Sequence, residues 1–371
     1  MSQKANIRSP YFLKYQDTDL TRVELDLHVY SGTVETDKGD PVYSLENDVI
    51  AGQNYAIFEV SEFTSDYFEH SFTGTYYSNT LWFTAVARLY DSSDQLISTF
   101  TQHFLAMDGY TAYEDGVNAQ GNRGALTTTS TIFIPENETY KLPVFSEDVI
   151  SVTMFTPQIV GSAATSLWNT ETREWQLNDD YWDTQASADT STLTETATLS
   201  TGKIQYATIP STVRRVTVTT ASGAKDYVVN EVCAEISGKR KLTFVNKHGA
   251  LEDLWFTGLR KDTVNTTGSE YKATPIDFGT MTYSSSSPQI NRNHVNGEYF
   301  ISLNTGWVHE DVNSSLEELI MSQNVWLTED NVVTPMIVVG NSLEKISQKE
   351  NNIVQYNISL KKAHNINNTA I

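Results

Sequence analysis

The sequence predicts an all-β protein with two or three antiparallel β-sandwich-like domains and one short helix near the C-terminus. Apolar and polar residues alternate along many short stretches, and β-branched and aromatic residues fill these stretches. Clusters of Gly, Asn, Asp and Ser separate them, as expected of turns between strands. A length of 371 residues is enough for several hydrophobic cores.

Residues 1–115 are expected to form a sandwich of immunoglobulin-like or fibronectin-like proportions. Val23, Leu25, Leu27 and Val29 alternate with polar residues, as in a half-buried strand. The best hairpin signal is the turn-forming run 91–94, DSSD, between two long strand-like stretches. A short helix is expected at 61–68. The regular strand spacing is typical of a small sandwich.

Residues 116–130 are rich in Gly and Asn and are expected to be a linker. Residues 131–371 then form a larger β-domain, or two domains divided near residue 280, where the polar segment 281–293 begins. Ser222 and Gly223 are expected at the tip of a hairpin. Pro335 predicts that its strand lies at a sheet edge or begins there.

The one long helix is expected just after residue 312. Asn313 or Ser314 can cap it, with Ser314 and Glu317 at the spacing of a capping box. Leu316, Leu319 and Ile320 then share one face at helical spacing, which predicts that this face packs on a core.

The stretch 241–259, KLTFVNKHGALEDLWFTGL, predicts two strands joined by a turn. Leu251, Leu254 and Phe256 are available to a core in the second strand. His248 in the turn is expected to point to water rather than to bind a ligand. Trp255 is expected to be buried or to lie at an interface.

Charge and cysteine content exclude several classes of protein. The formal net charge of −21 disfavours nucleic-acid binding, which needs clustered basic residues, and the run 239–241 is expected to be solvated charge at a sheet edge. Cys233 is the single cysteine, so neither an internal disulfide nor a cysteine-based metal site is expected. The N-terminus lacks an apolar signal segment, and no run is long enough to span a bilayer. We therefore expect synthesis in a cytoplasm and no membrane insertion.

No catalytic or phosphate-binding motif occurs, so we expect no enzymatic activity, no catalytic residues, no metal and no cofactor. The densest cluster of acidic and aromatic residues lies at 171–189 and is read first as a surface loop. Two alternatives stay open there. Trp175, Tyr181 and Trp182 are the candidate platform for stacking a surface glycan. The carboxylates offer a glycosidase pair or a calcium site, and they are Glu171, Glu174, Asp179, Asp180, Asp183 and Asp189.

Three segments carry a resemblance to a known class of protein. They are residues 7–33 (IRSPYFLKYQDTDLTRVELDLHVYSGT), 241–256 (KLTFVNKHGALEDLWF) and 305–327 (TGWVHEDVNSSLEELIMSQNVWL). This pattern resembles virion structural proteins of tailed bacteriophages of marine or gut bacteria, of the tail or baseplate type. The resemblance covers scattered parts of most of the chain and assigns no functional residues.

The resemblance implies a structural subunit of the tail or baseplate that works by oligomeric assembly. It implies synthesis in the host bacterial cytoplasm, location in the virion, and contacts with copies of itself and with other virion proteins. A head-decoration or neck protein is the nearest alternative. A carbohydrate-binding, receptor-binding module is the alternative from another class.

Overall fold

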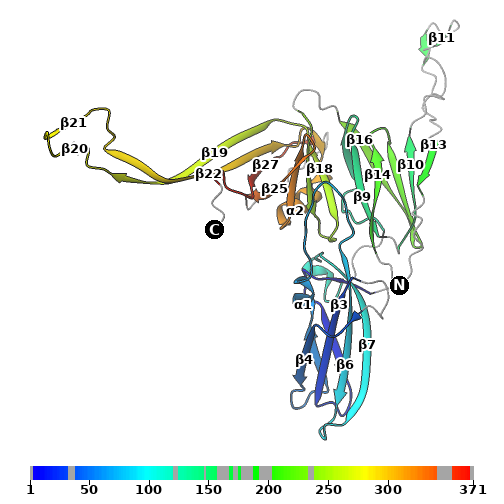
Figure 1. Cartoon of the computed structure of the whole chain (residues 1–371). Helices are drawn as coiled ribbons and strands as arrows, with labels where there is room; N and C mark the ends of the chain where they lie inside the picture. Colours follow the sequence, from blue (N-terminus) through cyan, green and yellow to red (C-terminus); the bar gives the residue numbers. More distant parts are fainter. Residues whose placement is uncertain are drawn as a thin grey trace.

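The computed structural model describes residues 3–31, 38–119, 124–145, 148–156, 167–169, 174–176, 187–191, 203–232, 238–340 and 353–367 (Figure 1). The predicted all-β class is confirmed, because strands dominate these ranges and α2 (Val312–Met321) is their one helix of more than five residues. The chain forms three units, which follow one another in the sequence, and each has its own hydrophobic cluster.

The N-terminal unit pairs two sheets over one core. A five-stranded sheet has the order β1 (Gln3–Asn6), β7 (Leu96–Met107), β6 (Thr80–Tyr90), β3 (Arg22–Tyr30) and β4 (Tyr43–Asp48). Strands β2 (Phe12–Gln16) and β5 (Tyr55–Glu59) form the facing pair, and helix α1 (Ser61–Ser65) and the 3-10 turn η2 (Tyr113–Asp115) complete the unit.

The predicted apolar face of β3 and the turn at 91–94 are confirmed, except that Val29 is half-buried and His28, expected on the polar face, is buried. Val23, Leu25 and Leu27 are fully buried between the two sheets. The Asp91 carboxylate accepts the backbone N–H groups of Ser93 and Gln95 at 2.8 and 2.9 Å, which closes the β6–β7 hairpin. The likeness to immunoglobulin or fibronectin domains stays a prediction.

The middle unit has a five-stranded sheet with the order β13 (Ser187–Ser191), β10 (Val149–Thr156), β15 (Arg215–Thr220), β16 (Gly223–Val232) and β8 (Thr131–Pro135). The pair β9 (Thr139–Phe145) and β14 (Ile204–Pro210) packs against it through the apolar cluster of this unit. A further hairpin joins β11 (Leu167–Asn169) to β12 (Glu174–Gln176). The predicted hairpin with Ser222 and Gly223 at its tip is β15–β16.

The C-terminal unit is a seven-stranded sheet with α2 on its core. Its order is β18 (Leu251–Phe256), β17 (Arg240–Val245), β24 (Val325–Glu329), β25 (Val332–Val339), β27 (Asn357–Lys362), β22 (Ile290–Asn304) and β19 (Arg260–Lys272). Strands β23 (Val308–His309) and β26 (Ile353–Val354) form a small separate pair.

Strands β19 and β22 continue far beyond the rest of this sheet and project from the body (Figure 1). We call residues 260–304 the arm and residues 273–289 its tip, which contains β20 (Ile276–Asp277) and β21 (Thr282–Tyr283). The alternative domain division near residue 280 falls in this tip. Because β19 and β22 pair with each other on either side of it, the chain is not divided there.

Two predictions about α2 and its neighbours need correction. The helix begins at Val312 with Asp311 as its N-cap residue, not Asn313 or Ser314, and no capping side-chain hydrogen bond forms. Val312 is buried, and the Asp311 carboxylate accepts the hydroxyl of Thr131 at 2.8 Å instead of capping the helix. The predicted packing face is confirmed, since Leu316 and Leu319 are fully buried.

The prediction that Pro335 marks an edge strand is wrong. Strand β25 lies between β24 and β27, so it is interior. Pairing with β27 begins at Met336, and the Pro335 carbonyl accepts the N–H of Ala363 at 3.0 Å. The missing N–H of Pro335 therefore falls at the end of a ladder, where no strand hydrogen bond is lost.

The segment expected to be a linker is partly built into the body. Ala125 pairs with Val144 of β9, and the Leu126 N–H donates to the Pro143 carbonyl at 2.8 Å. Thr127 is fully buried. This part of 116–130 thus packs where the three units meet.

Candidate functional site

The three units meet at the turn between β17 and β18. Arg8 of the N-terminal unit donates through Nη2 to the Asn246 carbonyl at 2.6 Å and through Nε to the Asp108 carbonyl at 3.0 Å. The Tyr110 N–H donates to the Lys247 carbonyl at 2.7 Å. We call this region, together with the side chains of His70, Asp108, Asn246, His248, Glu252 and Glu318, the junction.

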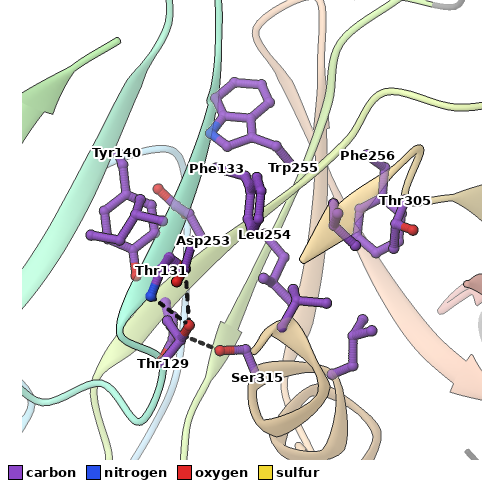
Figure 2. A pocket seen from close by; sticks show the side chains of 15 residues that line it. Thr129, Thr131, Phe133, Tyr140, Asp253, Leu254, Trp255, Phe256, Thr305 and Ser315 are labelled. Carbon is purple, nitrogen blue, oxygen red and sulfur yellow. Dashed lines mark hydrogen bonds between the residues drawn. The ribbon is translucent and has the colours of Figure 1, made fainter. Parts of the chain in front are cut away.

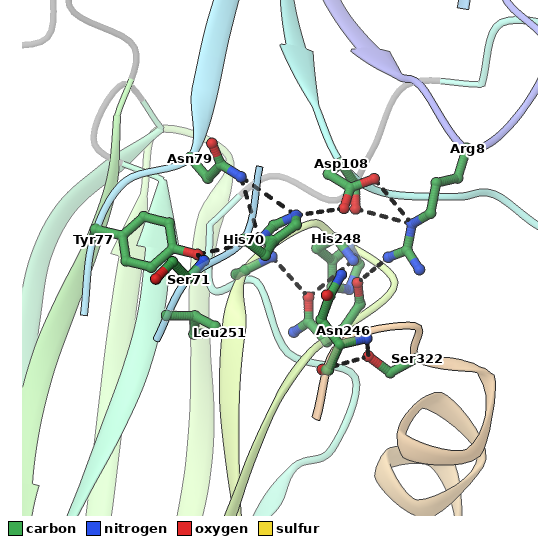
Figure 3. A network of polar contacts seen from close by, with 12 residues as sticks. Arg8, His70, Ser71, Tyr77, Asn79, Asp108, Asn246, His248, Leu251 and Ser322 are labelled. Atoms are coloured by element: carbon green, nitrogen blue, oxygen red, sulfur yellow. Dashed lines mark hydrogen bonds and ion pairs between the residues drawn. The ribbon is translucent and has the colours of Figure 1, made fainter. Parts of the chain in front are cut away.

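A histidine–carboxylate pair lies at one side of the junction. His70 Nε2 is 2.6 Å from Asp108 Oδ2, and Asp108 Oδ1 is 3.3 Å from Arg8 Nε. The other ring nitrogen contacts the Tyr77 hydroxyl at 3.3 Å, and Asn79 lies at the same ring (Figure 3). A catalytic pair needs an adjacent nucleophile or an exposed ring nitrogen. Because these partners include no serine or cysteine and the His70 side chain is 4% exposed, the pair holds elements together.

The expectation that His248 points to water is wrong. His248 is buried beneath the turn, and its Nε2 has no hydrogen-bond partner in the described part of the chain. Burial, together with the charges of Lys247, Lys225 and Lys4, lowers its pKa to about 3, so the ring is neutral at physiological pH. The turn packs against Asp108 instead of facing solvent. A Cβ on Gly249, whose φ is +78°, would lie 2.7 Å from the Asp108 nitrogen.

Glu252 is the most deeply buried acid of the junction. Its Oε2 accepts Asn246 Nδ2 at 2.7 Å, and its Oε1 accepts the hydroxyls of Ser315 at 2.9 Å and Thr127 at 3.2 Å. Burial first, and then the charge of Glu318, raises the Glu252 pKa to about 8. The carboxyl group is therefore protonated at neutral pH.

Glu318 connects α2 to the same region. Its carboxylate accepts the Lys247 N–H at 3.1 Å and the Thr128 hydroxyl. Burial raises the pKa of Glu318, and those hydrogen bonds together with the charges of Lys247 and Arg8 oppose the rise. Groups of the C-terminal unit and of the 124–131 segment thus satisfy two buried acids, as buried polar groups require.

Asp253 points to the opposite face of β18 and is also buried. It accepts the hydroxyls of Tyr76 and Thr243, each at 2.7 Å, and lies 3.6 Å from Lys241 Nζ. Burial is the main cause of its raised pKa. The reading of residues 239–241 as solvated edge charge is wrong, because β17 is an interior strand and Arg240 also pairs with Glu329 at 3.0 Å.

The cavity between the middle unit, β18 and α2 is small. Tyr140, Trp255, Phe256 and Thr305 are among its lining residues (Figure 2). Its volume of about 20 Å³ is close to the space of one water molecule, far below the volume of a small-molecule pocket. Trp255 is half-buried at this cavity, in agreement with the expectation that it is buried or at an interface.

A wider, open cleft of about 660 Å³ lies beside Tyr76, Lys141 and Tyr206. The Tyr76 ring contacts Tyr206 and Phe72 with centroid distances of 5.1 and 5.3 Å, and its hydroxyl donates to Asp253. The Tyr76 ring therefore packs against other side chains of the protein and is not available for stacking on a ligand.

The structure does not test the residues predicted for glycan contact. Tyr181 and Trp182 lie outside the described residues, and for Trp175 the structure describes the β12 backbone but not the side chain. The same holds for the acids of 171–189, of which only Glu174 and Asp189 lie on described strands. Cys233 also lies outside the described residues. Within the described ranges, no group of His, Cys, Asp and Glu side chains could hold a metal ion.

Sequence reasoning missed the buried acids of β18. In the run LEDLWF, Glu252 and Asp253 look like surface charges, because ionisable acids are rarely fully buried. The strand is instead covered on both faces, by α2 and the 124–131 segment on one and by Tyr76 on the other. One signal of a structured turn was available in the sequence, namely the nearby Asn246. Its side chain accepts the N–H groups of His248 and Ala250.

Comparison with known proteins adds little. No family model matches the chain, and no curated protein matches it. In the part of the chain that the structure describes, no helix has the length and apolar character needed to cross a membrane. One solved structure, titled "Crystal structure of CBD12 from CALX1.2", aligns with 56% of this chain and 72% of its own at 11% identity. Its TM-score is 0.18, so this likeness supports no statement about fold or function.

Proposed function

We propose that this chain is a structural subunit of a tailed-bacteriophage virion, in the tail or baseplate, and that it works by oligomeric assembly without catalysis. The observation that carries this proposal is the arm. The arm projects from the body (Figure 1), and most of its residues are exposed on both faces. A two-stranded ribbon of this kind is marginally stable by itself in water, which favours a partner along it.

The tip of the arm supports the same proposal. Phe278, Met281 and Tyr283 are 75%, 77% and 73% exposed, and they lie within a few residues of one another. Large apolar side chains clustered at an exposed tip are typical of a surface that another protein covers.

The junction supports a mechanical role. Glu252 and Glu318 are buried, and hydrogen bonds from Arg8, Thr127 and Thr128 join the N-terminal unit and the 124–131 segment to the C-terminal unit. These groups fix the parts of the chain against one another rather than meet a substrate. An arm can hold a partner in position, or carry load, only if the units of the body to which it is attached do not move relative to one another. The resemblance of residues 7–33, 241–256 and 305–327 to virion proteins is in line with this role.

The test is to locate the chain in purified particles. A short epitope inserted between Ser92 and Ser93, in the exposed β6–β7 turn, leaves the arm and the junction untouched. Antibody labelling at one position on the tail or baseplate, with a fixed copy number, is the expected result. Untagged particles are the control. Labelling at the head or neck would replace the tail assignment, and particles without the chain would overturn the proposal.

A further inference from the structure

The outer edge of β19 is unpaired. This strand ends the seven-stranded sheet, and no described strand pairs with its other side. We infer that β19 of a second copy of this chain adds antiparallel to this edge, with Asp262 of one copy opposite Lys272 of the other. This inference deepens the proposed function, because it names the partner of the arm and the edge that receives it.

The other edge of the arm is already covered. Strand β27 pairs with Phe300–Asn304 of β22, and the C-terminal residues continue along the same edge. The Ile366 N–H donates to the Gly297 carbonyl at 2.9 Å, and Asn367 Nδ2 donates to the Val295 carbonyl at 2.7 Å. Strand addition to the proximal half of the arm is therefore directed to β19.

The backbone of β19 presents a regular row of free groups. The Leu259 carbonyl and the Ala273 N–H both bond to the β22 side, at 3.0 and 2.8 Å. The register shift opposite Thr267 and Ser269 adds its extra residue to β22, not to β19. Because strand residues alternate in direction, even-numbered residues from Asp262 to Lys272 point their N–H and C=O groups outward.

Charge favours a second copy as the partner. The arm holds four basic and four acidic residues, so it is neutral in a chain of net charge −21. Two acidic copies repel each other least where their neutral arms meet. In the inferred register, outward-facing Asp262 and Lys272 form an ion pair at each end of the shared ladder, and each Thr263 faces Tyr271 of the other copy.

The same register accounts for the exposed apolar side chains. Residue 274 lies opposite residue 260 of the other copy, so the tip of each arm reaches the root of its partner. Leu259 and Trp307 are 76% and 68% exposed at this root. The exposed Phe278, Met281 and Tyr283 of one tip are then close enough to cover them.

The first experiment measures association of the purified full chain by analytical ultracentrifugation. Thr266→Pro removes one outward N–H, and proline is tolerated on the free side of an edge strand. We expect it to raise the dimer dissociation constant at least roughly tenfold, the effect of a lost hydrogen bond and local strain. Thr266→Ala keeps the N–H and should associate like the parent, and both variants should retain the parent melting temperature at concentrations where all three proteins are monomeric. A monomeric parent, or Thr266→Pro associating like the parent, overturns the inference.

The second experiment tests the register in a Cys233→Ser background. In the inferred dimer, Thr267 lies on the two-fold axis, opposite Thr267 of the other copy, in a non-hydrogen-bonded pair. The Cα atoms of such a pair are about 4.5 Å apart, which is close enough for a disulfide. Thr267→Cys should therefore form a disulfide dimer under mild oxidation. Thr263→Cys should not, since each Thr263 faces Tyr271. Linking at 263 but not at 267 overturns the register.

The two proposals fail separately. If particles carry the chain but Thr266→Pro has no effect on association, only the β19 pairing is wrong. If Thr266→Pro weakens association but no particle contains the chain, the pairing stands and the virion assignment fails.

Discussion

Replacement of Glu252 by Gln tests whether the junction holds a protonated acid. The side chain keeps its shape, Asn246 can still donate to its oxygen, and the hydroxyls of Ser315 and Thr127 can rotate to accept its N–H groups. The change thus removes the ionisable proton and little else. It alters the pH dependence of the free energy of unfolding more than its value at acid pH.

The sign and size of the effect follow from the shifted pKa. Glu252 has a pKa of about 8 when folded, against 4.5 for an ordinary glutamate, so between these values the unfolded state binds fewer protons than the folded state. Stability from this group is complete below pH 4.5 and is lost as the pH rises to 8. Between pH 6.5 and 8 the parent should lose about 2 kcal/mol through Glu252.

This pH range avoids the opposite contribution of His248. Its folded pKa of about 3 lies below the ordinary 6.5, so its contribution changes mainly below pH 6.5, and the small change above that pH is the same in the parent and in the Gln variant. Urea unfolding followed by tryptophan fluorescence at pH 6.5, 7, 7.5 and 8 measures the slope. The Gln variant should lack the 2 kcal/mol decline, while Glu136→Gln, the same change at an exposed acid, should keep it. Equal slopes in the parent and Glu252→Gln would refute a buried, protonated Glu252.

Two further substitutions test the turn of the junction. Gly249→Ala should cost about 2 kcal/mol more stability than Gly116→Ala, as measured by urea unfolding. Both glycines have φ near +80°, but only at Gly249 would the added Cβ collide with the backbone of Asp108. Equal losses of stability in the two variants would contradict the close packing at Gly249. On going from pH 6.5 to 4.5, His248→Leu should gain about 2 kcal/mol of stability relative to the parent, since in the parent the unfolded histidine gains a proton there and the folded one does not. The exposed His364→Leu is its control, and an unchanged acid slope in His248→Leu would count against a buried neutral ring.

Local patterns were sufficient to predict most of the strands. Val23, Leu25 and Leu27 alternate because one face of β3 meets a core, and the Asp91 turn forms because a carboxylate can bond the N–H groups that follow it. The packing face of α2 was equally readable from Leu316 and Leu319. The start of that helix was not, because Asp311 is drawn into a contact with Thr131.

The sequence by itself thus determined the all-β class, the strand faces and the turns, since these depend on neighbours along the chain. The tertiary structure decided what covers each strand. Glu252, Asp253 and His248 look like surface residues until α2, the 124–131 segment and Asp108 enclose them. The arm shows the opposite case. Its Val264 and Tyr271 are residues typical of a strand that packs on a core, but they lie exposed. Periodicity reports which side chains share a face, whereas burial depends on partners that are distant in sequence.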